Sequence, residues 1–305
     1  MATRTRPPRS ADGRIGRAGN GNRAAGARKA PWVRRFVPAP DVLAAVAGGV
    51  VLSLANPPLD VGPLAFLALV PLVLAARRAT VRRAVWLGMW FGLAYNAILL
   101  SWLAEGSPFA YPPTAIVQAA FPALFAIAIP LLWRDERPLT SSVGLASAWV
   151  AVDFLRSITP VGGFTWGAIA NTQHHNPLLL PLASVTGAWG VTWVVAFASC
   201  ALAAVVVQVR GSRTAVRAVA VTVAAAAALC ITPVAIALPS ANGPSLDIAV
   251  VQGNSFQSHP ESYAKRSRRV ALDHVRLTFE LADGNRPDLV VWPENALDVD
   301  PLHHA

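Results

Sequence analysis

Glu294 is the residue of this sequence whose type and surroundings best suit catalysis. It lies in the segment PDLVVWPENA, residues 287–296, where an apolar run with strand character, Asp288 to Trp292, leads into a turn at Pro293. The strand delivers this single carboxylate into the turn, where it is a candidate for acid–base chemistry. Together with the apolar spans that precede it, the segment indicates an enzyme that works at a membrane surface, with Trp292 as a candidate substrate-binding residue.

The elements around Glu294 predict a strand–helix–strand unit. Leu246 to Gln252 has the pattern of a buried strand, and Glu261 to Asp283 has the pattern of a charged helix with one apolar face. Gly284 is typical of a helix end. Two strands joined through a helix are expected to be parallel neighbours. The apolar face of the helix contains Ala271, Val275, Phe279 and Ala282.

This unit, within residues 239–305, is small for a complete domain. Two parallel strands and one helix cannot cover both faces of a sheet, and parallel sheets are normally buried on both faces. Small domains also bury too little surface to be stable without further support. We therefore expect the domain to continue past residue 305 in the intact protein.

The composition is typical of a membrane protein. The chain has 305 residues, of which 54% are hydrophobic and only 14% charged, whereas soluble domains carry about 25% charged residues. The net charge of +10 does not indicate a nucleic-acid partner, because ten of the 26 Lys and Arg lie in the first 35 residues, ahead of the first apolar span. Charge placed there is a topology signal and attracts anionic lipid. Residues 1–40, rich in Arg, Gly, Ala and Pro, are expected to form a disordered basic tail.

Residues 41–238 are expected to form a transmembrane helical bundle of about seven spans. A crossing helix needs about 20 mostly apolar residues. The first two spans are shorter than the others and are separated by Asn56, Pro57 and Pro58, which predicts a tight hairpin. The seven apolar spans are 41–56, 61–76, 84–103, 109–133, 141–158, 178–209 and 215–238.

The distribution of basic residues predicts the orientation of these spans. With the tail inside the cytoplasm, successive inner loops hold four, two and three Arg residues, nine in all, and the outer loops hold Arg156 alone. This asymmetry follows the positive-inside rule and, for seven crossings, places everything after about Pro239 outside the cytoplasm. The nine are Arg77, Arg78, Arg82, Arg83, Arg134, Arg137, Arg210, Arg213 and Arg217.

The outer loop from Arg156 to Pro177 holds two further candidate substrate-binding residues, Phe164 and Trp166. Aromatic rings accumulate at the membrane interface, and the preceding Gly162-Gly163 pair permits tight backbone geometry. An interfacial anchor and a contact for lipid are both open interpretations of the two aromatics. Asp153, three residues before Arg156, is expected to form a local ion pair with it.

No metal or cofactor is expected. His174 and His175 are adjacent, so on a helix their rings would point apart. Cys200 and Cys230 both lie within apolar spans, without the spacing of metal ligands. They are expected to be small buried side chains rather than a disulfide.

The sequence resembles the apolipoprotein N-acyltransferase family over nearly all of residues 41–305. The resemblance implies a bacterial plasma-membrane enzyme: a polytopic α-helical membrane bundle followed by an α/β nitrilase-like (α-β-β-α) carbon–nitrogen hydrolase domain outside the cytoplasm, of which residues 239–305 are an incomplete part. The segment WPENALDVDPL at 292–302 is most similar to the actinobacterial branch. The other matching segments are LANPP at 54–58, FGLAYNAILLSWL at 91–103, GGFTWG at 162–167, VVQGN at 250–254 and PDLVVWPEN at 287–295.

The resemblance also implies a mechanism with a Glu–Lys–Cys triad. A membrane phospholipid donates an acyl chain to the cysteine as a thioester, and the amino-terminal diacylglyceryl-cysteine of an apolipoprotein accepts it as an amide. Glu294 matches the family's Glu, so the resemblance implies that it acts as the general base, accepting a proton from the thiol and then from the attacking amine. The chain has no Cys after Cys230, and Lys265 precedes the Glu, which is the wrong position. Neither role is carried over, so residues 1–305 alone are expected to be inactive.

Two other functions remain open at this stage. A membrane-anchored amidase or nitrilase would share the Glu and the fold and would act on a C–N bond without lipid. A membrane scaffold with a degenerate outer domain would need no catalytic residues at all. Phospholipid-dependent acylation of a lipopeptide separates the acyltransferase from the amidase.

Overall fold

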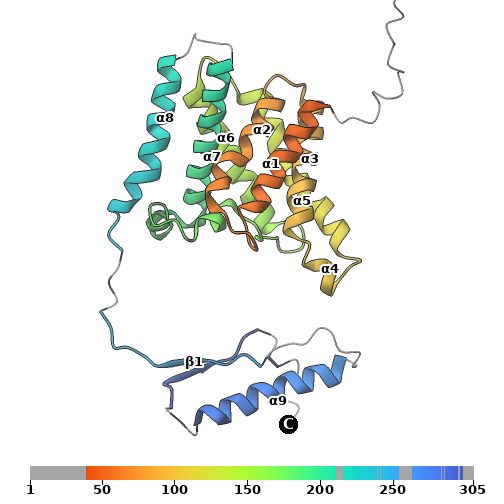
Figure 1. Ribbon diagram of the computed structural model, residues 1–305, viewed down its shortest axis with the longest axis vertical. Helices are drawn as coiled ribbons and strands as arrows, with labels where there is room; N and C mark the ends of the chain where they lie inside the picture. Colours follow the sequence, from red (N-terminus) through yellow and green to blue (C-terminus); the bar gives the residue numbers. More distant parts are fainter. Residues whose placement is uncertain are drawn as a thin grey trace, which may run out of the picture. The chain divides into compact units, whose positions relative to one another are not determined.

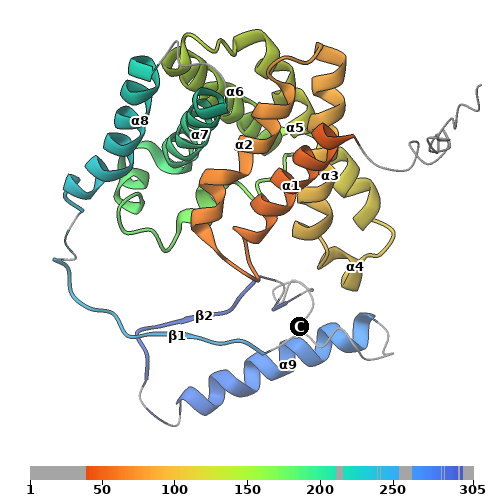
Figure 2. The ribbon, with the colours of Figure 1, turned by 45° about the horizontal axis from the view of Figure 1, so that its top comes forward.

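The structure is a computed structural model of the chain, and it describes residues 39–210, 216–238, 240, 242–253, 263–282, 284, 286–294, 296 and 297. The expected tail falls almost entirely outside the described residues. Residues 40–238 form a bundle of helices (Figures 1 and 2). Its long helices are α1 (Pro40–Leu54), α2 (Ala65–Ala76), α3 (Val81–Leu99), α5 (Tyr111–Leu132), α6 (Pro138–Ile158), α7 (Ala183–Arg210) and α8 (Val216–Ile231). The short ones are η2 (Gly62–Leu64), α4 (Leu103–Gly106), η3 (Ile169–Gln173), η4 (Leu180–Leu182) and η6 (Thr232–Ala235).

Each of the seven predicted apolar spans overlaps one of these long helices. Four segments of the described residues are long and apolar enough to cross a membrane: Tyr111–Leu132, Pro138–Ile158, Leu180–Val209 and Val216–Ala235. The third has a kink at Gly187, whose φ is +63°. The length and apolar composition of these helices identify the chain as a membrane protein. The number of membrane crossings stays a prediction.

The α1–α2 hairpin is the shortest helical pair of the bundle. Its two helices have 15 and 12 residues, fewer than the roughly 20 that cross a membrane. Half of α2 is buried, because it packs against α1, α3, α5 and α7. The connection predicted from the Asn-Pro-Pro sequence is a turn at residues 55–61. The hairpin is therefore a short apolar element that packs against α3 through α1 and against α7 through α2.

Small residues let the helices of the bundle approach closely. A Cβ on Gly92 of α3 would lie 2.7 Å from the backbone of Ala119 in α5, and a Cβ on Gly49 of α1 would lie 2.2 Å from the carbonyl oxygen of Phe91. Helices in a membrane associate through this kind of contact, because lipid tails are as apolar as the side chains they replace. Around these contacts lies a core that includes Phe91, Phe125 and Trp149.

Ion pairs and turns define the two ends of the bundle. At one end, Arg77 pairs with Asp135 and Arg83 pairs with Asp41; we call it the basic end, and it is uppermost in Figure 1. At the other, the loop end, the 55–61 turn lies against η3 through a hydrogen bond from Gln173 Nε2 to Gly62 O of 3.0 Å. The alternating helices collect Arg77, Arg78, Arg82, Arg83, Arg134, Arg137 and Arg217 at the basic end.

The described residues after 242 contain the expected strand–helix–strand unit. Strands β1 (Ile248–Val250) and β2 (Leu289–Val291) are parallel, with Ile248 opposite Leu289 and Val250 opposite Val291. Helix α9 (Tyr263–Ala282) joins them (Figure 2). A nitrilase-like domain built on this unit stays a prediction.

The packed face of α9 differs from the predicted apolar face. Phe279 is 69% exposed, whereas His274 is only 1% exposed. His274 accepts a hydrogen bond from Gly253 N–H at Nε2, 3.0 Å, and its Nδ1 lies 2.7 Å from Val270 O. The helix therefore turns a polar residue toward the strands, because the end of β1 offers a backbone donor that an apolar side chain would leave unpaired.

Candidate functional site

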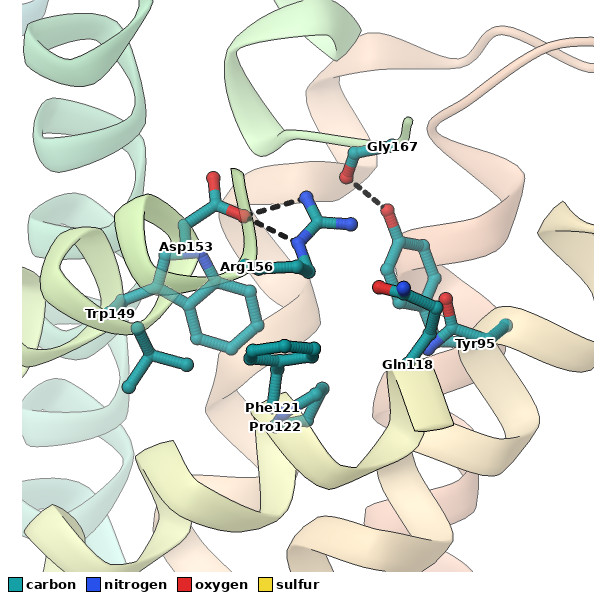
Figure 3. Close-up of a pocket in the computed structure, with 10 residues that line it drawn as sticks. Tyr95, Gln118, Phe121, Pro122, Trp149, Asp153, Arg156 and Gly167 are labelled. Atoms are coloured by element: carbon teal, nitrogen blue, oxygen red, sulfur yellow. Dashed lines mark hydrogen bonds and ion pairs between the residues drawn. The ribbon is translucent and has the colours of Figure 1, made fainter. Parts of the chain in front are cut away.

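At the loop end, two side chains from the bundle hold the loop of residues 162–167. Arg156 Nη1 donates to Trp166 O over 2.7 Å, and the Tyr95 hydroxyl donates to Gly167 O (Figure 3). Phe164 N–H donates to Arg156 O over 2.9 Å. Arg156 comes from the last turn of α6 and Tyr95 from the last turns of α3. The loop is therefore fixed to two helices that are far apart in the sequence.

Glycines give this loop its shape. Gly163 and Gly167 have φ of +92° and +76°, values that side-chain-bearing residues rarely adopt. A Cβ on Gly163 would lie 1.9 Å from Ser157 O, and one on Gly167 would lie 2.3 Å from Leu99 Cδ2. The tight geometry predicted for the Gly162-Gly163 pair is confirmed, since Gly162 also has a positive φ.

Beneath the loop, Asp153 and Arg156 form the predicted ion pair, and the pair is buried. Arg156 donates to Asp153 Oδ1 from Nε over 2.9 Å and from Nη2 over 2.6 Å. Each residue is 6% exposed. Both bonds go to the same carboxylate oxygen. Asp153 Oδ2 is also buried, and it has no hydrogen-bond partner among the described residues.

The pair lines a cavity of about 20 Å³, which is large enough for a water molecule. Apolar groups of Phe121, Pro122 and Val152 form part of its wall (Figure 3). Four residues that line it carry buried polar atoms without a hydrogen-bond partner in the described part of the chain: Asn96 Oδ1, Gln118 Oε1, Asp153 Oδ2 and Trp149 Nε1. Native proteins leave few such atoms unpaired. The residues that line the cavity therefore carry three acceptors and one donor that a small polar group could pair with.

The two predicted aromatics of the outer loop occupy different environments. Phe164 is partly buried against the core. Trp166 is 55% exposed and packs against Trp102, which is 46% exposed, with ring centroids 5.3 Å apart. Phe109 nearby in the sequence is 95% exposed. Phe164 thus anchors the loop, and Trp166 belongs to an exposed aromatic rim.

Glu294 and Trp292 lie in the strand–helix–strand unit. Glu294 is exposed in the turn after β2, which is closed by a hydrogen bond from Ala296 N–H to Pro293 O of 3.3 Å. Trp292 Nε1 donates to Thr278 Oγ1 over 2.9 Å, and its ring lies 5.4 Å from that of His274. Trp292 therefore holds the end of β2 against α9 and positions the turn that carries Glu294.

Sequence reasoning missed Tyr95, Asn96, Gln118 and Trp149. A signal was present, because polar residues within apolar spans are costly and usually face a bundle interior or a cavity. The two cysteines are as expected: both are free, Cys200 is buried and Cys230 is partly buried.

The prediction for the adjacent histidines was wrong in its geometry. His174 and His175 directly follow the short 3₁₀ helix η3, and their ring centroids are only 3.9 Å apart. Both rings face one carboxylate oxygen, Asp60 Oδ2, at 3.2 Å from His174 Nε2 and 3.6 Å from His175 Nε2. The error arose from assuming an α-helix, in which neighbouring side chains diverge by about 100°.

Comparison with known proteins relates the chain to one family. The sequence model of the apolipoprotein N-acyltransferase N-terminal domain matches residues 48–201. Proteins named apolipoprotein N-acyltransferase are similar to 85% of this chain, with 28% identity in Geobacter metallireducens, 30% in Azotobacter vinelandii and 31% in Pseudomonas putida. In each case the chain spans about half, 52%, of the relative's length.

The matched region includes the four residues with unpaired polar atoms and the loop above them. The family model begins within α1 and ends within α7, so it covers the helices that build the cavity. The resemblance found in the sequence motifs is thereby confirmed, and the chain belongs to the apolipoprotein N-acyltransferase family.

Proposed function

We propose that the protein N-acylates the amino-terminal diacylglyceryl-cysteine of apolipoproteins, with a membrane phospholipid as acyl donor. The observation that carries the proposal is the family match, because it covers the helices that form the loop-end cavity. Acyl transfer proceeds in two steps. A cysteine thiolate attacks the phospholipid ester carbonyl, the C–O bond breaks, and the lysophospholipid alkoxide takes a proton. The lipoprotein amine then attacks the thioester carbonyl, the C–S bond breaks, and the thiol is restored.

Glu294 is the proposed proton acceptor in both steps, first from the thiol and then from the attacking amine. Its exposed position at the end of β2 leaves it accessible to a substrate. The sequence has no cysteine after Cys230, so residues 239–305 do not supply the thiol. The 305 residues alone are therefore expected to bind substrate without turning it over.

The loop-end cavity is the proposed site for the polar head of the donor phospholipid. Its three unpaired acceptors match the three N–H groups of a primary ammonium. An ammonium is about the size of a water molecule, which the cavity accommodates. The exposed rim of Trp102 and Trp166 then lies where a lipid glycerol region would meet the loop.

This arrangement requires the loop end to face the outside of the plasma membrane. The basic end carries the Arg residues of the inner loops, and the positive-inside rule places such residues in the cytoplasm. Seven crossings would then place the amino terminus in the cytoplasm and the strand–helix–strand unit outside, where we propose that it forms part of a nitrilase-like domain. Aminophospholipid and lipoprotein would both reach the loop end from the outer leaflet.

Lipid binding by this chain tests the proposed site. Native mass spectrometry of residues 1–305 should show bound phosphatidylethanolamine. It should show little phosphatidylcholine, whose trimethylated nitrogen is larger and has no N–H. Asp153→Asn should weaken phosphatidylethanolamine binding by roughly tenfold or more, since a hydrogen bond to a charged group contributes about 1.5–3 kcal/mol. Asp41→Asn, in the ion pair at the basic end, is the matched control. Equal binding of the two lipids would contradict the headgroup assignment.

The reaction itself is tested with the native protein purified from its source membranes. A diacylglyceryl lipopeptide incubated with phospholipid should gain the mass of one acyl chain, and Glu294→Gln should slow this gain by roughly a hundredfold or more. Hydrolysis of small amides without lipid would instead indicate an amidase. A native protein that binds lipid and performs neither reaction would indicate a scaffold.

A further inference from the structure

Asp60, His174 and His175 form a second cluster at the loop end, outside the cavity described above. The ligand atoms of the three side chains lie within 4.8 Å of one another. Asp60 lies in the turn before η2 and has a φ of +57°, a conformation that Asp tolerates better than most residues. One oxygen of its carboxylate faces both imidazoles, and the other, Oδ1, is buried without a partner in the described residues.

The hydrogen bonds of His174 leave an electron pair directed at Asp60. His174 Nδ1 lies 2.9 Å from Asn171 O, so this nitrogen carries a proton that it donates to the carbonyl. In the neutral ring, Nε2 then presents its lone pair to Asp60 Oδ2, only 3.2 Å away. Two electron-pair donors at this distance repel each other unless a proton or a metal ion lies between them, and one proton on His174 does not bridge the second contact, from His175 Nε2 to the same oxygen at 3.6 Å. We infer that Asp60, His174 and His175 bind a divalent transition-metal ion of the zinc class.

The distances from the Asp60 oxygen to the two histidine nitrogens fit such an ion. Zinc binds imidazole nitrogen and carboxylate oxygen at about 2.0–2.2 Å, so two ligands of a tetrahedral site lie about 3.3 Å apart. The Asp60 oxygen lies 3.2 Å and 3.6 Å from the two ring nitrogens. Two protonated rings with centroids 3.9 Å apart would place like charges side by side, whereas one shared metal ion is bound by two neutral rings.

The surrounding residues hold the donors in place. Metal-bound histidines usually donate their second ring N–H to a carbonyl or carboxylate, and His174 does so to Asn171. Gln173 Nε2 donates to Gly62 O over 3.0 Å, and Asn176 Nδ2 donates to Gln173 Oε1 over 2.9 Å. These bonds tie the histidine segment to the turn that carries Asp60 before any ion binds.

A hollow of about 320 Å³ lies beside the cluster, lined in part by Asp60, Gln173 and His175. It leaves room for water as the remaining ligand of the ion. Imidazole nitrogen selects zinc-like ions over Mg²⁺ and Ca²⁺, which prefer oxygen donors. The ion would join the α1–η2 turn to the segment after η3, two parts of the loop end that are more than a hundred residues apart in the sequence.

The test is Zn²⁺ binding by the detergent-solubilised 305-residue chain, measured by competition with a chromophoric chelator. The chain should bind one Zn²⁺ at this site. Asp60→Asn and His174→Gln should each reduce the affinity by tenfold or more, and Mg²⁺ should not compete. The sequence also contains a histidine pair at His303 and His304. The double variant His303→Ala/His304→Ala is therefore the matched control and should keep the tight site.

Thermal unfolding separates lost binding from lost folding. Without metal, Asp60→Asn and His174→Gln should melt within a few degrees of the unsubstituted chain. When Zn²⁺ is added, only the unsubstituted chain should gain stability. Zn²⁺ binding that disappears with His303→Ala/His304→Ala but persists in Asp60→Asn would overturn the inference. So would the absence of Zn²⁺ binding at micromolar concentrations.

Discussion

Asp135 and Asp153 lie before the start and near the end of α6, and both pair with arginine, yet their surroundings differ. Asp135 accepts bonds on both oxygens: Trp133 Nε1 and Arg77 Nη1 reach Oδ1 at 2.7 and 2.8 Å, and Arg78 Nη2 reaches Oδ2 at 2.7 Å. Asp153 accepts two bonds from Arg156 on one oxygen and leaves the other buried and unpaired. The first arrangement is complete without a ligand, and the second is not.

This difference separates a structural carboxylate from one that a ligand can use. A buried acceptor without a partner destabilises the fold by about 1–3 kcal/mol, so its presence beside a polar cavity is best explained by a group that completes it. At the basic end, the paired carboxylate of Asp135 holds loop residues together. At the loop end, Asp153 has a carboxylate oxygen that can still accept a hydrogen bond from a ligand.

The largest expected effect comes from breaking the buried pair. Arg156→Gln leaves the Asp153 charge buried without its partner and removes the donor to Trp166 O, so the free energy of unfolding should fall by about 3–5 kcal/mol. Denaturant titration in detergent micelles measures it. The double variant Asp153→Leu/Arg156→Met should recover much of this loss while still failing to bind phosphatidylethanolamine. A double variant that binds the lipid normally would show that the pair is structural only.

A smaller effect is expected from the backbone of the loop. Gly167→Ala places a Cβ 2.5 Å from Tyr95 Oη at a φ of +76°, so it should lower the free energy of unfolding by about 2–3 kcal/mol and separate the loop from α3. Gly162→Ala is the matched control. Gly162 has a similar φ, +87°, but open space around it, so its substitution should cost only about 1 kcal/mol. Equal losses in the two variants would mean that the Tyr95 contact contributes nothing.

At the basic end, the pH dependence of stability should follow Asp135. Partial burial alone would raise its pKa, but hydrogen bonds from Arg78, Trp133 and Arg77 outweigh burial and hold the pKa below its usual value. A lowered folded-state pKa gives a stability contribution that is complete above the unfolded-state value. That contribution is lost as the pH falls through the folded-state value, below about pH 4.

The matching variant is Asp135→Asn. It should lower the free energy of unfolding by about 1 kcal/mol at neutral pH and flatten the decline in stability below about pH 4. Melting curves at a series of pH values measure both effects. If Asp135→Asn loses stability below about pH 4 as steeply as the unsubstituted protein does, other carboxylates cause the acid sensitivity.

The smallest effect on stability is expected for the exposed rim. Trp166→Ala removes a side chain that is 55% exposed, so the free energy of unfolding should change by only about 0.5 kcal/mol. Acyl transfer by the native protein should nevertheless slow if Trp166 guides lipid to the cavity. Normal lipid turnover by this variant would reduce Trp166 to an interfacial anchor.

The sequence predicted the helices and strands well. Long apolar runs indicate membrane helices, the arginines between alternate runs indicate where these helices end, and short apolar runs indicate buried strands. It also predicted the Asp153–Arg156 pair, which needs only helical spacing. It did not predict the cavity, since Tyr95, Gln118 and Asp153 come from three different helices whose rotations are set by packing at positions such as Gly92. A polar residue in an apolar span indicates that its side chain has a polar partner, but the sequence does not identify which residue or ligand that partner is.

Predictions that depended on local conformation were the weakest. The apolar face expected for α9 includes Phe279, yet the helix packs through His274, because the partner was a backbone N–H rather than an apolar surface. The histidine pair was expected to diverge, yet a 3₁₀ segment and a distant aspartate bring both rings together. The roles of Glu294 and Trp292 stay predictions, placed at the end of β2 as the sequence indicated.

The short α1–α2 hairpin also has a consequence for the surrounding lipid. Helix α1, with 15 residues, rises about 22 Å, roughly 8 Å less than the thickness of a typical hydrocarbon core. For a bundle placed in a bilayer as proposed, such a mismatch is relieved by thinning of the membrane next to the short helix. Phospholipid headgroups beside α1 would then lie deeper than elsewhere in the leaflet, which shortens the distance that a donor lipid must move to reach a loop-end site.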